Sequence, residues 1–257
     1  MRLLDPPVVA ASLSGESDAD WARTAAPYVG AAILGGIALD GPTRRAARAM
    51  IGRGRDEFLP PEPIAFMADQ LEACEPLPLR AGWNVRAVET PPIRTAAAIC
   101  ADYGAILEIN AHCRQDEMCA AGAGEHLLRQ PERLREQVWA AAASGATVSV
   151  KVRTEVSGVD LPSVAEIAGA AGADIIHVDA MDSEAVVADV VAATDATVIA
   201  NNGVRDRATV REYADYGADA VSVGRPSDDP VVLARVRRAA GAVIDSDRVP
   251  GTDVGAP

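Results

Sequence analysis

Residues 106–128 read Ile-Leu-Glu-Ile-Asn-Ala-His-Cys-Arg-Gln-Asp-Glu-Met-Cys-Ala-Ala-Gly-Ala-Gly-Glu-His-Leu-Leu. The first five residues are mostly apolar and compatible with β structure, so they predict a strand over 106–110. Asn110, His112 and Cys113 stand at or just past its end. In parallel α/β proteins the chemistry lies at the carboxyl ends of strands, so this stretch predicts both the fold class and the place of the site. The alternative interpretation is an ordinary βα loop with a packed cysteine.

Two glycines follow within the same stretch. Gly122 and Gly124 would let the backbone turn tightly or approach a flat ligand, and a helical turn is expected at 125–128.

Apolar runs and helical spacings alternate along the rest of the chain. Strands are expected at 8–12, 31–36, 79–88, 106–110, 147–153, 174–178, 197–201 and 220–224. Helices are expected at 21–28, 44–53, 64–74, 92–103, 131–144, 161–171, 183–193, 207–216 and 230–244. Eight βα units predict a single-domain (β/α)8 TIM barrel of the α/β class over residues 1–244, with a disordered tail at 245–257. An open doubly wound sheet is the alternative, but no G-x-G-x-x-G follows the first strand.

The composition is acidic. The 257 residues carry a formal net charge of −13, and Lys151 is the single lysine beside 23 arginines. This balance predicts a halophilic protein and, taken alone, disfavours autonomous binding of a phosphate backbone. No segment has the roughly 18 apolar residues of a membrane helix, and the cysteines show no disulfide spacing, so we expect a cytoplasmic protein without a membrane partner.

Polar residues recur where the predicted strands end. A lysine within a strand suits a narrow anionic site, because its amino group is a compact point charge. Glycine turns after the last two strands predict a phosphate site near helix N-termini. The candidates from the strand ends are Asn84, Asn110, Cys113, Lys151, Arg153, His177, Asn201, Gly203, Gly224 and Arg225. His177 alone could equally be a satisfied core histidine, and the turn at 202–203 could be only a turn.

These residues resemble the tRNA-dihydrouridine synthase barrels, which bind FMN. The resemblance rests on Val-Lys-Val-Arg at 150–153, the strand-end histidine, Asn-Gly after the seventh strand and Gly-Arg after the eighth. Asn110, Cys113, Gly122, Gly124, Leu127 and Leu128 also fall at spacings compatible with that family's Asn-x-Gly-Cys-Pro, Gly-x-Gly and Leu-Leu.

The resemblance implies a role for each candidate. Cys113 would be the general acid, with Cys119 as its rival. Asn110 and Arg153 would bind substrate, and no metal site is expected. FMN contacts would come from Asn84, Lys151, His177, Asn201, Gly203, Gly224 and Arg225.

The chain also departs from the family pattern. His112-Cys113-Arg114 replaces Gly-Cys-Pro, Asp179 stands where an arginine usually follows the histidine, and the first strand lacks Pro-Met. We expect a divergent, archaeal-type branch without the family's C-terminal helical domain.

Three functions remain open from the sequence. The first is an FMN enzyme that reduces the C5–C6 double bond of a uracil in tRNA with NADPH or NADH. The second is an FMN oxidoreductase of the dihydroorotate or dihydropyrimidine dehydrogenase type, acting on a free pyrimidine or other small molecule. The third is a flavin-free phosphate-binding barrel.

Overall fold

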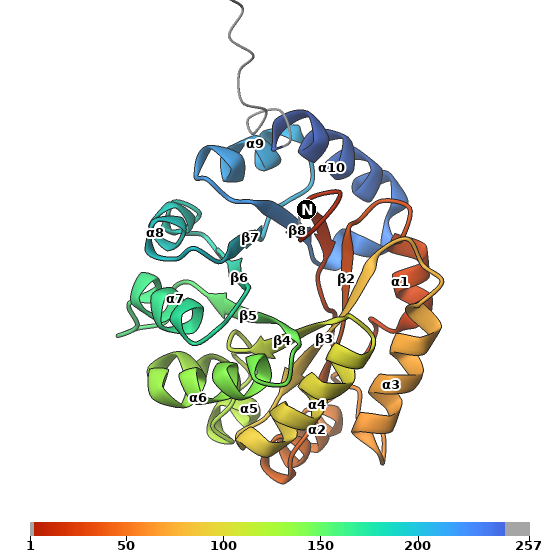
Figure 1. Ribbon diagram of the computed structural model, residues 1–257, viewed down its shortest axis with the longest axis vertical. Coiled ribbons are helices and arrows are strands. Elements are labelled where there is room, and N and C mark those ends of the chain that lie inside the picture. The colour runs from red at the N-terminus through yellow and green to blue at the C-terminus, as the bar shows by residue number, and fades with distance from the viewer. Residues whose placement is uncertain (1–2, 245–257) are drawn as a thin grey trace, which may run out of the picture.

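Eight parallel strands close into a barrel in the computed structural model, which describes residues 3–244. Each strand pairs with its neighbour in sequence, and the eighth pairs with the first. Figure 1 shows the strands as an inner ring that the helices surround. The TIM barrel predicted from the sequence is confirmed. The strands are β1 (Val8–Ala10), β2 (Ala31–Ala38), β3 (Arg80–Arg86), β4 (Ile106–Asn110), β5 (Thr147–Arg153), β6 (Ile175–Asp179), β7 (Thr197–Asn201) and β8 (Ala220–Val223).

Capping side chains begin several of the helices. Asp18, Asp40, Asp206 and Asp229 each accept a hydrogen bond from a backbone N–H of the first turn. The helices are α1 (Ala19–Ala25), α2 (Gly41–Gly52), α3 (Pro63–Cys74), α4 (Thr90–Asp102), α5 (Asp116–Ala120), α6 (Pro131–Ala142), α7 (Leu161–Ala170), α8 (Val186–Ala193), α9 (Arg207–Asp215) and α10 (Pro230–Val243), with short 3-10 helices η1 (Gly124–Arg129) and η2 (Arg225–Asp228). No helix within residues 3–244 is long and apolar enough to span a bilayer. The tail expected at 245–257 lies outside the described residues.

The strands carry two kinds of side chain in alternation. Those that face the helices are apolar, such as Trp83, Leu107 and Val150, and pack in the main core. A second, smaller core of mostly small and β-branched residues fills the barrel interior; it comprises Leu4, Val9, Ala31, Ile33, Ile106, Ile175, Ile199 and Ala220. Further along most of the strands the buried positions include polar residues, such as Asn84, Glu108 and Lys151, so one end of the barrel interior is apolar and the other is polar.

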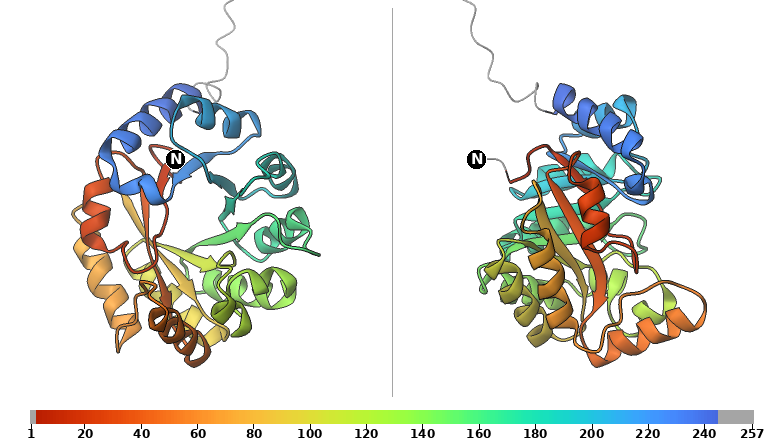
Figure 2. Two further views of the ribbon diagram at one scale, coloured as in Figure 1. Left: turned by 180° about the vertical axis from the view of Figure 1, so that it is seen from behind. Right: turned by 90° about the vertical axis from the view of Figure 1, so that its right-hand side faces the viewer.

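The segment after β4 differs from the sequence-based expectation. Residues 116–120 form the short helix α5, which the sequence did not predict, and the turn expected at 125–128 belongs to η1. α5 lies against α2, as Figures 1 and 2 show, and Arg53 forms an ion pair with Glu117 at 2.6 Å. The loop after β4 is therefore supported by an element two strands away.

Candidate functional site

A cavity of about 690 Å³ opens at the carboxyl ends of the strands. All the candidate residues from the sequence line it except His177; these are Asn84, Asn110, Cys113, Lys151, Arg153, Asn201, Gly203, Gly224 and Arg225. Residues of five strands (β3, β4, β5, β7 and β8) or of the loops after them thus meet in one space, as the barrel topology predicts.

His177 lies below the cavity, fully buried. Its Nδ1 lies 2.7 Å from Glu108 Oε2, and its Nε2 lies 2.7 Å from Ser222 Oγ. Burial and the nearby Lys151 lower the pKa of His177, while Glu108 opposes the shift. A neutral ring that donates from Nδ1 and accepts the Ser222 hydroxyl at Nε2 satisfies both contacts. Both ring nitrogens are thereby occupied by protein groups.

Glu108 is the centre of this buried network, and the sequence analysis did not single it out. Its carboxylate accepts hydrogen bonds from Asn84 Nδ2 at 2.8 Å and Ser149 Oγ at 3.1 Å, besides facing His177. Burial alone would raise the pKa of Glu108, but His177, Lys151 and Asn84 together lower it to about 2. The sequence did contain a hint of this role. Glu108 is a charged residue in a predicted strand that is otherwise mostly apolar, and it stands two positions before Asn110, so both side chains are expected on the same face.

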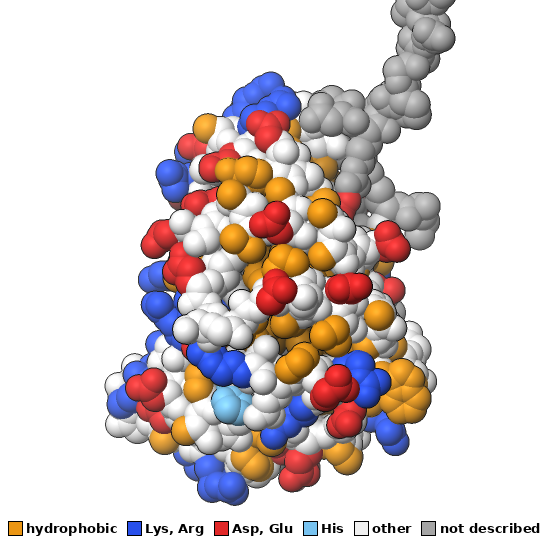
Figure 3. Space-filling model, turned by 90° about the vertical axis from the view of Figure 1, so that its left-hand side faces the viewer, with side chains coloured by type: hydrophobic (Ala, Val, Ile, Leu, Met, Phe, Trp, Pro, Cys, Tyr) orange, Lys and Arg blue, Asp and Glu red, His pale blue; other side chains and the backbone are white. Residues whose placement is uncertain are grey.

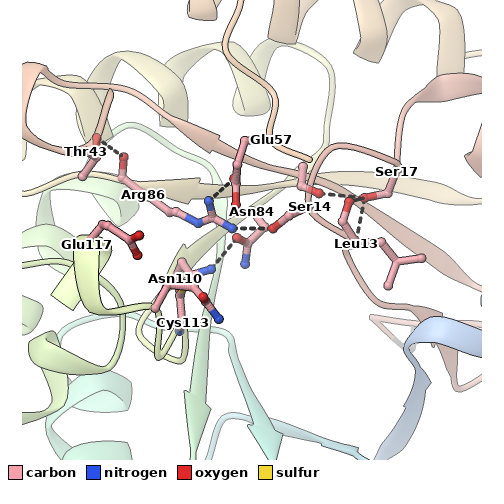
Figure 4. A network of polar contacts seen from close by, with 12 residues as sticks. Leu13, Ser14, Ser17, Thr43, Glu57, Asn84, Arg86, Asn110, Cys113 and Glu117 are labelled. Atoms are coloured by element: carbon pink, nitrogen blue, oxygen red, sulfur yellow. Dashed lines mark hydrogen bonds and ion pairs between the residues drawn. The ribbon is translucent and has the colours of Figure 1, made fainter. Parts of the chain in front are cut away.

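Two amides connect this network to the cysteine loop. Asn110 Nδ2 donates to Asn84 Oδ1 at 2.8 Å, and Asn110 Oδ1 accepts from the backbone N–H of Cys113 at 3.0 Å. Cys113 is 8% exposed and lines the cavity. Asn110 therefore holds the cysteine in place through its side chain. Figure 4 shows Asn84 and Asn110 joined by their hydrogen bond, with Cys113 of the following loop close to Asn110.

Gly124, eleven residues after Cys113, allows the chain to pack closely against the cysteine loop. A Cβ at Gly124 would lie 2.2 Å from the carbonyl oxygen of Cys113, and the φ of Gly124 is +62°. The thiol of Cys119 donates to that carbonyl at 3.4 Å. Burial, with Glu125 contributing, raises the pKa of Cys119 to about 11. Neither Gly124 nor Cys119 lines the cavity, so the close approach at Gly124 is to the Cys113 backbone and not to a ligand.

Lys151 reaches the cavity from β5. It is 2% exposed, and its amino group makes no hydrogen bond or ion pair with another residue in the described part of the chain. A buried cation without a protein partner is costly unless something else accepts its hydrogen bonds.

The loops after β7 and β8 form the opposite wall. Asn202 and Gly203 both have positive φ, +99° and +65°, and the hydroxyl of Tyr213 fixes the loop by donating to Asn202 O at 2.9 Å. A Cβ at Gly224 would meet no atom within 4 Å. The starts of α9 and α10 are capped by aspartates, which accept from the backbone N–H groups of Thr209 and Val231. The phosphate site expected near these helix starts stays a prediction.

Two arginines of the cavity are neutralised by ion pairs. Arg86 pairs with the buried Glu57 and donates to Ser14 Oγ at 2.5 Å, as Figure 4 shows. Arg153 pairs with Glu125 at 3.0 Å.

Other cations of the cavity lining remain unpaired. They are Arg55, Arg114, Lys151, Arg205 and Arg225, none of which forms an ion pair with another residue of the 3–244 range, against two lining carboxylates, Glu16 and Asp179. On the face in Figure 3, formed by the helices at the left of Figure 1, acidic and basic side chains are interspersed. The cavity mouth thus concentrates positive charge in a chain whose formal net charge is −13.

Comparison with known proteins places this site in a family. The dihydrouridine synthase (Dus) family model matches residues 87–250. A probable tRNA-dihydrouridine synthase of Rhodobacter capsulatus is 30% identical over 86% of this chain and 68% of its own length. An uncharacterized protein of Methanocaldococcus jannaschii is 30% identical over 53% of this chain, a match that spans about half (54%) of that relative.

Solved structures of low identity share the fold alone. Thiamine phosphate pyrophosphorylase from Pyrococcus furiosus has a TM-score of 0.55 at 11% identity, covering 92% of this chain and 96% of its own. The family match covers the strands and loops that carry Cys113, Lys151, Gly203 and Gly224. The chain therefore belongs to the dihydrouridine synthase family.

Proposed function

We propose that this protein is an FMN-dependent oxidoreductase that reduces the C5–C6 double bond of a uracil in tRNA, with NADPH or NADH as electron donor. The observation that carries the proposal is the buried, unpartnered Lys151 in a cavity whose other wall is made of two glycine turns and Arg225.

The cavity residues fit FMN. A volume of about 690 Å³ lies within the usual range of roughly 300–1,000 Å³ for ligand sites. Lys151 would face the polar edge of the ring system, and Gly203, Gly224 and Arg225 would hold the phosphate through backbone N–H groups and positive charge. FMN, when bound, supplies the hydride chemistry. Asn84 and Asn201 would contact the flavin from the cavity wall. His177 does not line the cavity and would instead hold the carboxylate of Glu108 in position beneath it.

Cys113 would donate the proton that C5 of the uracil gains. Its loop is held by Asn110 on one side and by the close approach of Gly124 on the other. Cys119 is the weaker candidate, because its thiol is committed to the Cys113 carbonyl and lies outside the cavity lining. Arg153, kept in place by Glu125, would bind the substrate.

The distribution of the unpaired cations favours RNA over a free pyrimidine. Arg205 and Arg225 follow β7 and β8, whereas Arg114 follows β4, which is opposite β8 in the barrel, and Arg55 lies in the segment between α2 and α3. A flavin phosphate would use the first pair. The second pair is then left for a ligand with further phosphates, which a free base lacks.

The decisive experiment combines flavin loading with product analysis. The purified protein is incubated with FMN, a reduced nicotinamide and tRNA from cells that lack the gene, and dihydrouridine is measured by mass spectrometry. We expect retained flavin, flavin reduction and dihydrouridine in the tRNA. A protein that retains no flavin would overturn the proposal, and consumption of free pyrimidines with no change in tRNA would support the small-molecule alternative.

Two matched variants test the acid. Cys113→Ala should keep flavin and its reduction by nicotinamide, while product formation falls about 10²–10⁴-fold. Cys119→Ala should retain most activity. The opposite result would assign the acid to Cys119, and normal turnover by both variants would exclude a thiol acid.

A further inference from the structure

His112 lines the cavity beside Cys113, where the resembled motif has a glycine. Its Nε2 makes no hydrogen bond with any residue in the range 3–244, whereas its Nδ1 lies 3.3 Å from Asn110 Oδ1. One edge of the imidazole is therefore anchored to the protein, and the other is available to a ligand. Which role Nε2 can play depends on whether it carries a proton.

The hydrogen bonds among Glu108, Asn84 and Asn110 determine whether His112 Nε2 carries a proton. Glu108 is ionised, so its oxygens only accept, and Asn84 must direct its NH₂ group at them, at 2.8 Å. The oxygen of Asn84 then faces Asn110 and accepts from its NH₂ group, also at 2.8 Å. Asn110 must consequently turn its own oxygen toward the cysteine loop, where the backbone N–H of Cys113 donates to it at 3.0 Å.

The same oxygen fixes the tautomer of His112. Asn110 Oδ1 also accepts from the backbone N–H of His112 at 3.3 Å, and because this oxygen can only accept, the favourable arrangement has the proton on the nitrogen that faces it, His112 Nδ1. Burial lowers the pKa of His112 well below its usual range, and Lys151 and Arg86 add to this effect, while Glu108 opposes it. The ring is therefore neutral at physiological pH, and its Nε2 presents a lone pair to the cavity.

We propose that His112 is a specificity-determining residue whose Nε2 accepts a hydrogen bond from the N3–H imide group of the pyrimidine. Glu108, Asn84 and Asn110 are positioning residues that fix the direction of this bond. Uracil offers a donor at N3, whereas cytosine offers an acceptor there and would leave two lone pairs opposed. The assignment of the imide to a uracil substrate rests on the proposed function; the direction of the hydrogen-bond chain does not.

The first experiment tests the chain without flavin or substrate. The protein has three histidines, so ¹⁵N spectra of histidine-labelled apoprotein are assignable with His112→Gln and His177→Gln. We expect His112 to show a protonated Nδ1 and an unprotonated Nε2 at neutral pH. A protonated Nε2 would overturn the proposal, whatever the enzyme's activity.

The second experiment uses two substitutions that mimic different halves of the ring. The amide of His112→Gln reaches about as far as Nε2 and can offer an acceptor there, whereas that of His112→Asn reaches about as far as Nδ1 and leaves the cavity without one. With FMN-loaded enzyme and tRNA, His112→Asn should lose about 10- to 100-fold in kcat/KM, mainly through KM, and His112→Gln should recover most of it.

Flavin retention separates the outcomes. If both variants keep flavin and reduce tRNA at the wild-type rate, His112 does not contact the substrate and the proposal is wrong. If His112→Asn instead releases flavin, the acceptor serves the imide of the flavin ring, which also overturns the substrate assignment. A wild-type protein that binds no flavin would refute the proposed function, and the ¹⁵N result would still decide the tautomer.

Discussion

Replacement of Glu108 by glutamine should destabilise the protein in a pH-dependent way. In the folded state the pKa of this carboxyl is lowered to about 2 from an ordinary 4.5. At about 1.36 kcal/mol per pKa unit, this difference corresponds to at most roughly 3 kcal/mol of stability, because His177 contributes its full share of the shift only where its ring is charged. Glutamine has nearly the same shape, but its NH₂ group must oppose either the NH₂ of Asn84 or the Nδ1–H of His177.

The sign of the pH dependence follows from the direction of the shift. A lowered pKa contributes stability that is complete above the unfolded-state value and is lost as pH falls from about 4.5 through about 2. Glutamine does not titrate, so the difference in free energy of unfolding between wild type and Glu108→Gln should be largest at pH 7 and shrink below pH ~4.5.

Urea unfolding, followed by tryptophan fluorescence from pH 7 to pH 3, measures this difference. Glu132→Gln is the matched control, because Glu132 pairs with Arg135 on the surface and is 76% exposed, so little change is expected. A stability difference for Glu108→Gln that is equally large at pH 7 and pH 3 would show that the carboxylate is not held ionised by its neighbours.

Three further changes test the cavity. Lys151→Arg should abolish flavin retention, measured by bound-flavin absorbance, because the broad guanidinium replaces a compact cation in a site that is 2% exposed; full retention would make Lys151 structural. Gly224→Phe should fold normally, since a Cβ there meets nothing, yet lose flavin; a fully loaded variant would place the phosphate elsewhere. Gly124→Ala should lower turnover more than flavin binding, because its Cβ would press on the Cys113 carbonyl; unchanged kinetics would show that this loop need not be rigid.

The fold could be read from the sequence because its signal is local and repeated. Each strand is a short apolar run, and helices α1, α9 and α10 begin after aspartates, which are common N-cap residues. The unexpected helix α5 lies in a segment of polar and small residues, where its position depends on contact with α2. Local periodicity carries no information about such a contact.

The candidate residues at the strand ends were also visible in the sequence, since parallel strands bring their carboxyl ends to one face. Only the tertiary structure divided them into a cavity lining and a layer beneath it. His177 has the same strand-end signature as Lys151, yet its ring turns to Glu108 and Ser222 while Lys151 remains without a partner.

The sequence by itself thus determined the barrel and the end of it at which most of the candidate residues lie. The roles of Glu108, of the two amides and of His112 depend on hydrogen bonds between strands that are far apart in the chain. The direction of each bond depends on the next one, back to a buried carboxylate that can only accept. Hydrogen bonds between side chains of different strands form only when the barrel brings those strands together. The spacing of residues along a single strand therefore cannot predict them.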